Sequence, residues 1–330
     1  MILNGNVIEK MKELETGSVQ CVVTSPPYWG LRDYGTESVI FGGDDYCEHD
    51  WNIKTRTTKN AHRAGMAKND KYASENDKKQ PDYFISDSGI CSKCNAKMGQ
   101  LGLESTPEEY VENMVEVFSQ IKRVLKHDGT VWLNLGDSYG DEKQLTGIPW
   151  RVAFALQADG WCLRQDIIWH KPNPMPESVT DRCTKSHEYI FLLTKSSRYF
   201  YDADGISEET VTHDDSIRNR DITKLNNTPG RTKMDGLKTN DYETRNRRSV
   251  WKINTQPYKE AHFAVFPEKL PELCIKAGSS KGDVVLDPFF GSGTTGYVAQ
   301  RLGRKWIGIE LNPEYVKIAN KRFAQQDLFA

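Results

Sequence analysis

The fold is decided by a glycine-rich block near the C-terminus, Leu286-Asp287-Pro288-Phe289-Phe290-Gly291-Ser292-Gly293-Thr294-Thr295-Gly296. A short apolar run before it predicts a buried strand, and residues 294–302 after it predict a helix. Glycines at such a junction let the backbone turn sharply and let a ligand approach the N–H groups of the helix N-terminus. Glu310 ends the next predicted strand, where a carboxylate can bind ribose hydroxyls. The block predicts a nucleotide-type cofactor site, with a purely structural glycine turn as the alternative.

Strands and helices alternate along most of the chain outside this block. Short apolar runs predict strands at residues 18–24, 130–135, 166–169, 189–194, 284–286 and 306–310. A capping box, Thr106-Pro107-Glu108-Glu109, opens a helix with one apolar face, which ends before a turn at residues 127–129. Further helices are predicted at 150–158, 267–277 and 294–302. This alternation predicts an α/β fold, with a mostly parallel twisted sheet and helices on both faces.

Two polar segments, residues 42–100 and 202–258, interrupt the alternation and are interpreted as insertions, the first of them irregular. The chain of 330 residues has a net charge of −2, but residues 53–80 carry about +5 and residues 216–259 about +7. Two basic stretches on an acidic body indicate a local face for a polyanion. Solvated, charge-rich loops are the alternative interpretation.

The first insertion contains two pairs of metal-ligand residues. Cys47 and His49 form a C-x-H pair, and Cys91 and Cys94 form a C-x-x-C pair, which together predict a four-coordinate structural zinc site. The chain has seven cysteines and neither a signal peptide nor a membrane-spanning run, which favours a reducing cytoplasm. Unliganded loop cysteines are the alternative. The remaining cysteines are predicted to lie in the core: Cys21, Cys162, Cys183 and Cys274.

A second block, Thr24-Ser25-Pro26-Pro27-Tyr28-Trp29-Gly30, follows the first predicted strand after the N-terminus. Its Ser25-Pro26-Pro27-Tyr28 matches the S-P-P-Y catalytic motif, and Asp287 to Thr294 matches the D-P-F-x-G-S-G-T motif, of S-adenosylmethionine-dependent DNA amino-methyltransferases. Three further segments resemble this family: residues 129–139, His262 to Leu270 (H-F-A-x-F-P-x-x-L) and Trp306 to Glu310 (W-I-G-I-E). The resemblance covers almost the whole chain outside the insertions and implies a Rossmann-like methyltransferase fold.

The resemblance also implies which residues hold S-adenosylmethionine. Glu310 would bind the ribose. Asn6 stands where family members often have an aspartate that contacts the adenine, and its amide can still hydrogen-bond. The other implied cofactor residues are Phe263, Phe266, Pro267, Asp287, Pro288, Phe289, Gly291, Ser292, Gly293 and Thr294.

The S-P-P-Y motif has a chemical rationale. An exocyclic amine is a poor nucleophile because its lone pair is delocalised into the base ring. Ser25 Oγ and the Pro26 carbonyl could accept both amine hydrogens and free that lone pair, and Pro26-Pro27 would fix the carbonyl. Tyr28 could stack on a flipped base. S-P-P-Y is typical of cytosine N4 and D-P-P-Y of adenine N6, so the motif favours cytosine N4.

The order of the motifs, catalytic first and cofactor last, is that of the β group of this family. It implies a catalytic part at 1–41 and 101–201, the zinc-binding insertion at 42–100, a target-recognition region at 202–258 and a cofactor part at 259–330. Residues expected to contact DNA are Lys171 and Asn173, in a segment similar to the family's W-x-K-x-N-x-x-P, and Arg245, Arg247, Arg248 and Lys252, which surround Trp251. Trp251 itself is predicted to be a packing residue. The partner implied is double-stranded DNA in a bacterial, archaeal or phage setting, with a homodimer and a companion restriction endonuclease left open.

Other protein classes fit less well. A non-catalytic zinc-bearing nucleic-acid-binding protein would not need both motifs intact. A nicotinamide-dependent oxidoreductase would carry its glycine loop near the start of the cofactor domain and leaves S-P-P-Y unexplained. Protein and RNA methyltransferases with N-P-P-Y usually place the cofactor motif first. Adenine-N6 methylation of DNA remains the main alternative.

Overall fold

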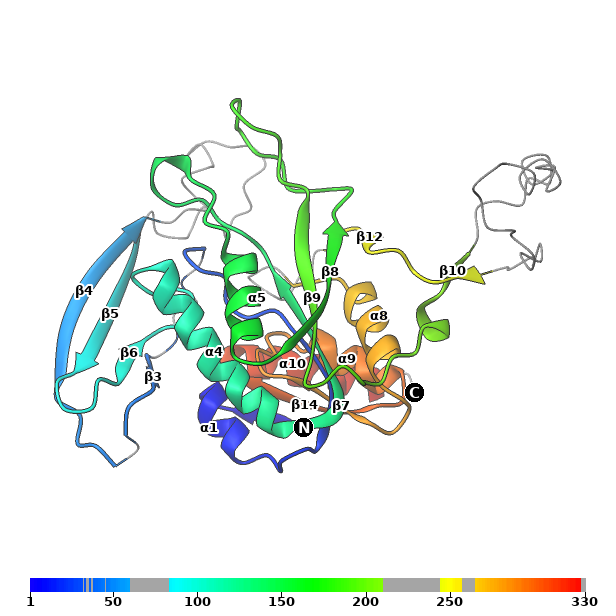
Figure 1. Cartoon of the computed structure of the whole chain (residues 1–330), viewed down its shortest axis with the longest axis horizontal. Helices are drawn as coiled ribbons and strands as arrows, with labels where there is room; N and C mark the ends of the chain where they lie inside the picture. The colour runs from blue at the N-terminus through cyan, green and yellow to red at the C-terminus, as the bar shows by residue number, and fades with distance from the viewer. Residues whose placement is uncertain are drawn as a thin grey trace, which may run out of the picture. The chain divides into compact units, whose positions relative to one another are not determined.

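The computed structural model describes residues 1–31, 33, 36, 38–44, 46–59, 83–209, 244–256 and 265–327 (Figure 1). The chain divides into two compact units, one made of Met1–Tyr201 and Ser249–Ala330, the other of Asp202–Arg248. The predicted cofactor residue Phe263 lies outside the described residues. None of the helices in the described segments is both long and apolar enough to cross a membrane.

The larger unit is built on one mixed sheet, which has eight strands within the described residues. β9 is antiparallel to both of its neighbours, and the other pairs are parallel. The mostly parallel α/β sheet predicted from the sequence is therefore confirmed. In spatial order the strands are β1 (Ile2–Asn4), β14 (Lys305–Glu310), β13 (Val284–Asp287), β2 (Val19–Thr24), β7 (Leu125–Leu135), β9 (His187–Thr194), β8 (Cys162–His170) and β12 (Val250–Lys252).

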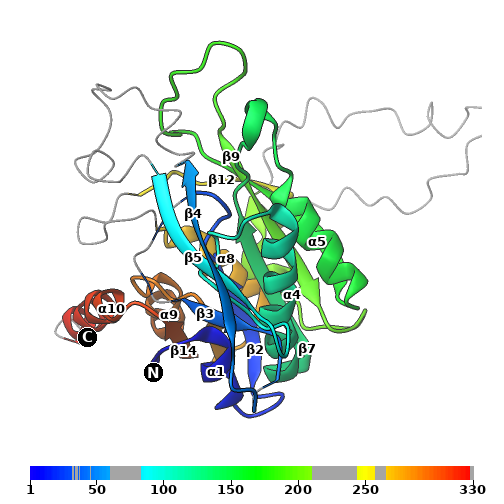
Figure 2. The same ribbon diagram turned by 90° about the vertical axis from the view of Figure 1, so that its left-hand side faces the viewer.

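Helices cover both faces of this sheet (Figure 2). One face carries α1 (Val7–Lys12), α4 (Pro107–Val124) and α5 (Ile148–Ala158), and the other carries α8 (Lys269–Gly278), α9 (Thr294–Arg301) and α10 (Pro313–Asp327). α4 begins at Thr106, whose Oγ1 accepts a hydrogen bond from the Glu109 N–H at 3.2 Å. Its predicted apolar face is fully buried at Met114, Phe118 and Ile121. The core thus forms as the sequence pattern predicts.

The centre of the sheet joins strands from opposite ends of the chain. β13 pairs with β2 in parallel, with Val285 opposite Cys21 and Leu286 opposite Val22. From β13 the chain continues through α9 to β14 on one side, whereas β2 is followed in the sheet by β7 on the other side. Ligands of open α/β sheets bind at such a switch point, outside the carboxyl ends of the strands. The fold therefore points to the edge where Thr24 and Asp287 end their strands.

The segment between residues 39 and 99 forms a second, antiparallel sheet in the order β3 (Val39–Phe41), β6 (Lys97–Gly99), β5 (Tyr83–Cys91) and β4 (Trp51–Lys59) (Figure 1). The expectation of an irregular segment at 42–100 was wrong for these residues. The strands carry few apolar residues in alternation, so the periodicity that identifies a strand is missing. Long antiparallel pairing, with Trp51 opposite Cys91 and Lys59 opposite Tyr83, holds β4 to β5 instead.

Smaller differences from the sequence predictions concern β7 and the cysteines. The predicted turn at residues 127–129 is an irregularity inside β7, because Leu125 pairs with Val19 and Thr130 already pairs with Cys21. Cys21 and Cys274 are buried, as predicted, but Cys162 is only half-buried and Cys183 is exposed. Short elements at the chain ends, β1, α1 and α10, also went unpredicted.

Candidate active site and metal cluster

The Ser25-Pro26-Pro27-Tyr28 segment leaves the carboxyl end of β2 at the centre of the sheet. Tyr110 Oη of α4 donates a hydrogen bond to the Pro27 carbonyl at 2.9 Å. The Gly30 N–H donates to the Gly102 carbonyl at 2.8 Å, and Gly102, at φ +93°, comes so close that an added Cβ would lie 3.1 Å from the Tyr28 carbonyl oxygen. The segment is therefore held from two directions before any ligand binds.

Five polar side chains from four strand ends meet at this segment. Ser25 Oγ donates to Tyr28 Oη at 3.1 Å, and Tyr28 Oη donates to Glu188 Oε2 at 2.8 Å. Asn134 Nδ2, near the end of β7, lies 2.6 Å from Tyr28 Oη and 2.9 Å from Glu188 Oε2. Lys171, directly after β8, forms an ion pair with Glu188 Oε1. Because β9 runs against the other strands, its first residues lie at the same edge as the ends of β2, β7 and β8.

Glu188 is ionised in this network. Burial alone would raise the pKa of the Glu188 carboxyl, but the Lys171 charge and the hydrogen bonds from Lys171, Asn134 and Tyr28 outweigh it and lower the pKa. The carboxylate is thus an acceptor on both oxygens. The Asn134 amide must then present Nδ2 to it, which leaves the buried Oδ1 without a partner among the described residues.

The glycine-rich block lies beside the Ser25 segment and is joined to it by Asp287. Asp287 ends β13, is 2% exposed, and accepts hydrogen bonds from Thr24 Oγ1 and Thr295 Oγ1, both at 2.7 Å. The Phe289 N–H donates to it at 3.1 Å. Burial raises the pKa of the Asp287 carboxyl to about 7, although these hydrogen bonds oppose the shift. Two motifs about 260 residues apart in the sequence are therefore linked by one carboxyl group.

The turn after β13 has the geometry of a ligand-binding loop. Gly291 and Gly293 have φ of +51° and +83°, which favour glycine. The Gly291 N–H donates to Glu310 Oε2 at 2.7 Å, and the Asn312 N–H donates to Glu310 Oε1 at 2.8 Å. Burial raises the pKa of the Glu310 carboxyl despite these bonds. Ser292 Oγ is buried and has no hydrogen-bond partner among the described residues.

The other predicted cofactor residues lie around this turn or form structural contacts. Pro288 is buried, Phe289 is half-buried, and Thr294 Oγ1 at the start of α9 accepts a hydrogen bond from Arg322 at 3.0 Å. Asn6 lies beside Glu310, since the Gly5 N–H donates to the Glu310 carbonyl, and Asn6 Oδ1 caps α1 through the Ile8 N–H at 2.8 Å. Phe266 is half-buried and Pro267 buried just before α8.

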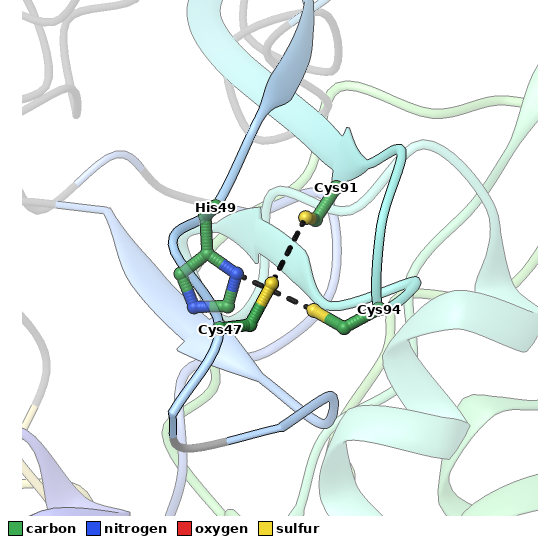
Figure 3. Close-up of side chains that lie close together, drawn as sticks. All are labelled: Cys47, His49, Cys91 and Cys94. Carbon is green, nitrogen blue, oxygen red and sulfur yellow. Dashed lines mark hydrogen bonds between the residues drawn. The ribbon is translucent and has the colours of Figure 1, made fainter.

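The four predicted metal ligands converge from the loop before β4, the last residue of β5 and the turn after β5 (Figure 3). The ligand atoms of Cys47, His49, Cys91 and Cys94 all lie within 4.8 Å of one another. Cys47 Sγ is 3.9 Å from Cys91 Sγ, and Cys94 Sγ is 3.4 Å from His49 Nδ1. The Asp50 N–H points at Cys91 Sγ at 3.4 Å, an arrangement that stabilises a thiolate. The sequence spacing therefore identified residues that the fold brings together.

The predicted DNA-contacting residues are distributed over both units. In the smaller unit, Arg245 and Arg248 bind the Glu208 carboxylate at 2.9 and 2.6 Å, and Arg247 donates to the Ile206 carbonyl. In the larger unit, Lys252 is exposed on β12, Lys171 pairs with Glu188, and Asn173 hydrogen-bonds the backbone of Thr255. Trp251 is 3% exposed, and its ring centroid lies 6.2 Å from that of Trp132, so its predicted packing role is confirmed.

Sequence reasoning missed Asn134 and Glu188 as members of the site. The sequence marks both residues as unusual, because Asn134 interrupts an apolar strand and Glu188 directly precedes the apolar run from Tyr189 to Thr194. A polar residue in a strand that reads as buried is an informative exception. Such an exception does not by itself place a residue in the site, because nothing in the sequence indicates which strand ends lie together.

Comparison with known proteins agrees with this geometry. A protein family described as DNA methylase matches residues 19–321. The Type II methyltransferase M.SmaI of Serratia marcescens is 38% identical, over 98% of this chain and 91% of that protein. The Type II methyltransferase M.Cfr9I of Citrobacter freundii is 37% identical, over 99% of this chain and 88% of that protein.

Two solved structures share the fold at low sequence identity. The PvuII DNA methyltransferase (cytosine-N4-specific) is similar with a TM-score of 0.61 and 20% identity, over 98% of this chain and 85% of that one. TTHA0409 from Thermus thermophilus, complexed with S-adenosyl-L-methionine, is similar with a TM-score of 0.54 and 21% identity, over 98% of this chain and 94% of that one.

Proposed function

Because the chain belongs to the DNA methylase family, we propose that it transfers a methyl group from S-adenosylmethionine to the exocyclic N4 of a cytosine flipped out of double-stranded DNA. The observation that carries the proposal is the juxtaposition of the two motifs at adjacent strand ends, with Thr24 bonded to Asp287. The S-P-P-Y form of the motif and the cytosine-N4 specificity of the PvuII enzyme support N4 over adenine N6.

The Ser25 segment supplies the amine-binding chemistry. Ser25 Oγ and the Pro26 carbonyl accept the two hydrogens of the target amine, which localises the nitrogen lone pair for attack. Proline rings fix φ in this segment, and the bond from Tyr110 to Pro27 holds it, so little ordering remains to be done on binding. The Tyr28 ring packs against Gly136, where an added Cβ would lie 2.6 Å from the ring. The base would stack on this fixed ring.

The glycine-rich turn fits S-adenosylmethionine by its own geometry. Apart from its chain neighbours, no atom of the described residues lies within 4 Å of the position that a Gly291 Cβ would take, so a ligand can approach the backbone there. Ser292 Oγ offers an unused polar group, and the Glu310 carboxylate is positioned for ribose hydroxyls. Asn6, Phe266, Pro267 and Phe289 would complete the pocket, as the family resemblance implies. The cofactor, when bound, supplies a methyl group on a positively charged sulfonium sulfur, which is a good leaving group because it departs as a neutral thioether.

Incubation of unmethylated DNA with S-adenosylmethionine labelled in the methyl group, followed by mass spectrometry of the nucleosides, tests the proposal. N4-methylcytosine is expected. N6-methyladenine would overturn the choice of base, and label in RNA or protein alone would overturn the substrate class. Ser25→Ala should lose about 10²-fold or more in turnover while cofactor affinity is unchanged. Ser119→Ala, on the exposed side of α4, is the matched control.

We also propose that Cys47, His49, Cys91 and Cys94 bind a structural Zn²⁺. A tetrahedral site with Zn–S of about 2.3 Å and Zn–N of about 2.0 Å has S···S edges of about 3.8 Å and S···N edges of about 3.5 Å. One S···S separation, 3.9 Å between Cys47 and Cys91, and one S···N separation, 3.4 Å between Cys94 and His49, match these edges, and all four ligand atoms lie within 4.8 Å of one another. Gly43 supports the same close packing, since a Cβ there would lie 3.0 Å from Cys94 Sγ. The ion would tie the loop before β4 to the turn after β5.

Metal analysis of protein purified without chelators should find about one zinc per chain. Cys94→Ser should lose the metal, whereas Cys183→Ser, an exposed cysteine outside the cluster, should keep it. Metal-free wild-type protein, or a zinc content that the Cys94 variant does not change, would remove this part of the proposal.

We propose that the unit Asp202–Arg248 recognises the DNA sequence. Its arginines suit guanine edges and phosphates, and Arg248 keeps 67% of its side chain exposed while bound to Glu208. Lys252 and Lys171 would contribute from the larger unit. Substitution of Arg247 by alanine should weaken binding to the methylated sequence more than binding to unrelated DNA. Equal weakening for both DNAs would assign this arginine to the phosphate backbone instead.

A further inference from the structure

We propose that Glu188 is a positioning residue that fixes the direction of a hydrogen-bond chain, so that Ser25 Oγ faces the target amine as an acceptor. This inference rests on the proposed function, in which Ser25 accepts a hydrogen of the amine. It adds Glu188, Asn134 and Lys171 to the residues on which the chemistry depends.

The direction follows from counting donors and acceptors. The ionised Glu188 carboxylate can only accept, so Tyr28 Oη must donate its single hydrogen to Oε2, 2.8 Å away. Asn134 Nδ2 can only donate, and it lies 2.6 Å from Tyr28 Oη. Tyr28 Oη, having given its hydrogen to Glu188, can bind Ser25 only as an acceptor, so Ser25 Oγ donates to it at 3.1 Å.

This arrangement determines what Ser25 presents to a ligand. Its hydrogen is donated to Tyr28, and the only other hydrogen-bond partner of Ser25 Oγ within the described residues is Asn134 Nδ2 at 3.5 Å, at the limit of a hydrogen bond. A lone pair of Ser25 Oγ therefore remains for an amine N–H. A hydroxyl that donates into a chain ending at a carboxylate is also a stronger acceptor, because hydrogen bonds in a chain polarise one another.

Lys171 makes the direction testable. It pairs with Glu188 Oε1, while Oε2 faces Tyr28 and Asn134. In Glu188→Gln, the Lys171 ammonium would hold the amide oxygen on its own side and turn the amide NH₂ toward Tyr28. Tyr28 would then receive two donors and donate to Ser25, which reverses the chain without changing the shape of the side chain. Lys171→Met would remove this constraint and let the amide rotate, with its oxygen toward Tyr28.

The experiment is a double-mutant cycle on single-turnover methyl transfer to DNA by the full-length protein. Glu188→Gln should slow transfer by about 10- to 100-fold in the wild-type background and by less than about threefold in the Lys171→Met background. Affinity for S-adenosylmethionine should stay within about threefold throughout. Glu177→Gln is the matched control, because Glu177 also pairs with a cation, Arg182, on the segment between β8 and β9. An equal effect of Glu188→Gln in both backgrounds would overturn the inference.

A second readout does not depend on methylation. Tyrosine labelled with ¹³C at Cζ reports whether the Tyr28 hydroxyl donates to a carboxylate. The Tyr28 signal should shift in Glu188→Gln and return toward its wild-type position in the double variant. A signal that ignores Glu188→Gln would refute the chain even if wild-type protein proved inactive on DNA. If adenine is the methylated base, the same rate cycle applies to that product, so failure of the base assignment is distinguishable from failure of this inference.

Discussion

Gly308→Ala should disrupt the cofactor turn through one aromatic ring. Gly308 lies in β14 under the Phe290 ring, and a Cβ added there would be 2.3 Å from Phe290 Cγ and Cδ2. Ordinary carbon contacts are about 3.5–4.0 Å, so the ring would have to move by more than about 1 Å. It has little room, because Trp306 stacks at 5.3 Å and a Cβ on Gly296 would already lie 2.6 Å from the ring. Overpacking of this kind costs about 1–3 kcal/mol.

The substitution should also weaken cofactor binding, because the backbone of Phe290 positions the glycine-rich turn. Its N–H donates to the Ile309 carbonyl at 2.9 Å, and the next residue, Gly291, donates to Glu310. A displaced ring therefore shifts Gly291 against Glu310. We expect the free energy of unfolding to fall by about 2–3 kcal/mol and affinity for S-adenosylmethionine to fall at least about tenfold.

Urea unfolding and isothermal titration calorimetry measure the two quantities. Gly99→Ala is the matched control, because Gly99 is also a strand glycine but, in the part of the chain that the structure describes, no atom beyond its neighbours lies within 4 Å of its Cβ position. Gly308→Ala combined with Phe290→Leu should recover part of the lost stability, since the smaller side chain relieves the overlap. A Gly308→Ala protein whose stability and cofactor affinity equal those of Gly99→Ala would refute the argument.

Three further predictions concern the other sites. Cys94→Ser should lower the free energy of unfolding by about 3 kcal/mol or more, because metal-binding energy contributes to folding; equal urea midpoints with and without zinc would contradict this. The pKa of Asp287 is raised to about 7 from an unfolded value of about 4, so its contribution to stability is complete below pH 4 and is lost as the pH rises through 7. Urea titrations between pH 5 and 8 should therefore show a smaller decline for Asp287→Asn than for wild type. Glu208→Gln should release two arginines, raise DNA affinity a few-fold at low salt and steepen the salt dependence by about one unit, whereas an unchanged slope would place those arginines away from DNA.

The sequence predicted most of the larger unit because its strands are buried on both faces. The run from Val19 to Thr24 is buried throughout and mostly apolar, Val284 to Leu286 is apolar throughout, and helices such as α4 show one apolar face. The two long strands of the small sheet lack both signals, because β4 is mostly polar and polar residues interrupt β5. The prediction for Cys183 failed for another reason: its sequence neighbours Arg182 and Thr184 are polar, so nothing local supported a place in the core, and it is exposed.

The site was predictable in its motifs but not in its connections. Ser25 and Glu310 could be predicted as site residues from short motifs at strand-to-turn junctions and from the resemblance of these motifs to those of the family. The bond between Thr24 and Asp287, and the chain from Ser25 to Glu188, depend on which strands are neighbours. Strand order is fixed by packing across the whole chain, so it has no local signature.

That strand order explains how a cofactor motif at the end of the chain can serve a catalytic motif at its beginning. β13 and β2 are parallel neighbours, so both motifs leave the sheet at one edge regardless of their distance in sequence. At that edge, Asp287 joins the two turns through its hydrogen bond with Thr24, and the hydrogen bonds from Ser25 through Tyr28 to Glu188 of β9 orient Ser25.

Thr24→Val tests whether these two sets of hydrogen bonds act independently. It removes one bond to Asp287 but leaves Glu188 in place, so cofactor affinity should fall while the effect of Glu188→Gln on transfer stays the same. If instead the two substitutions proved strongly coupled, the two sets of hydrogen bonds would act as one unit.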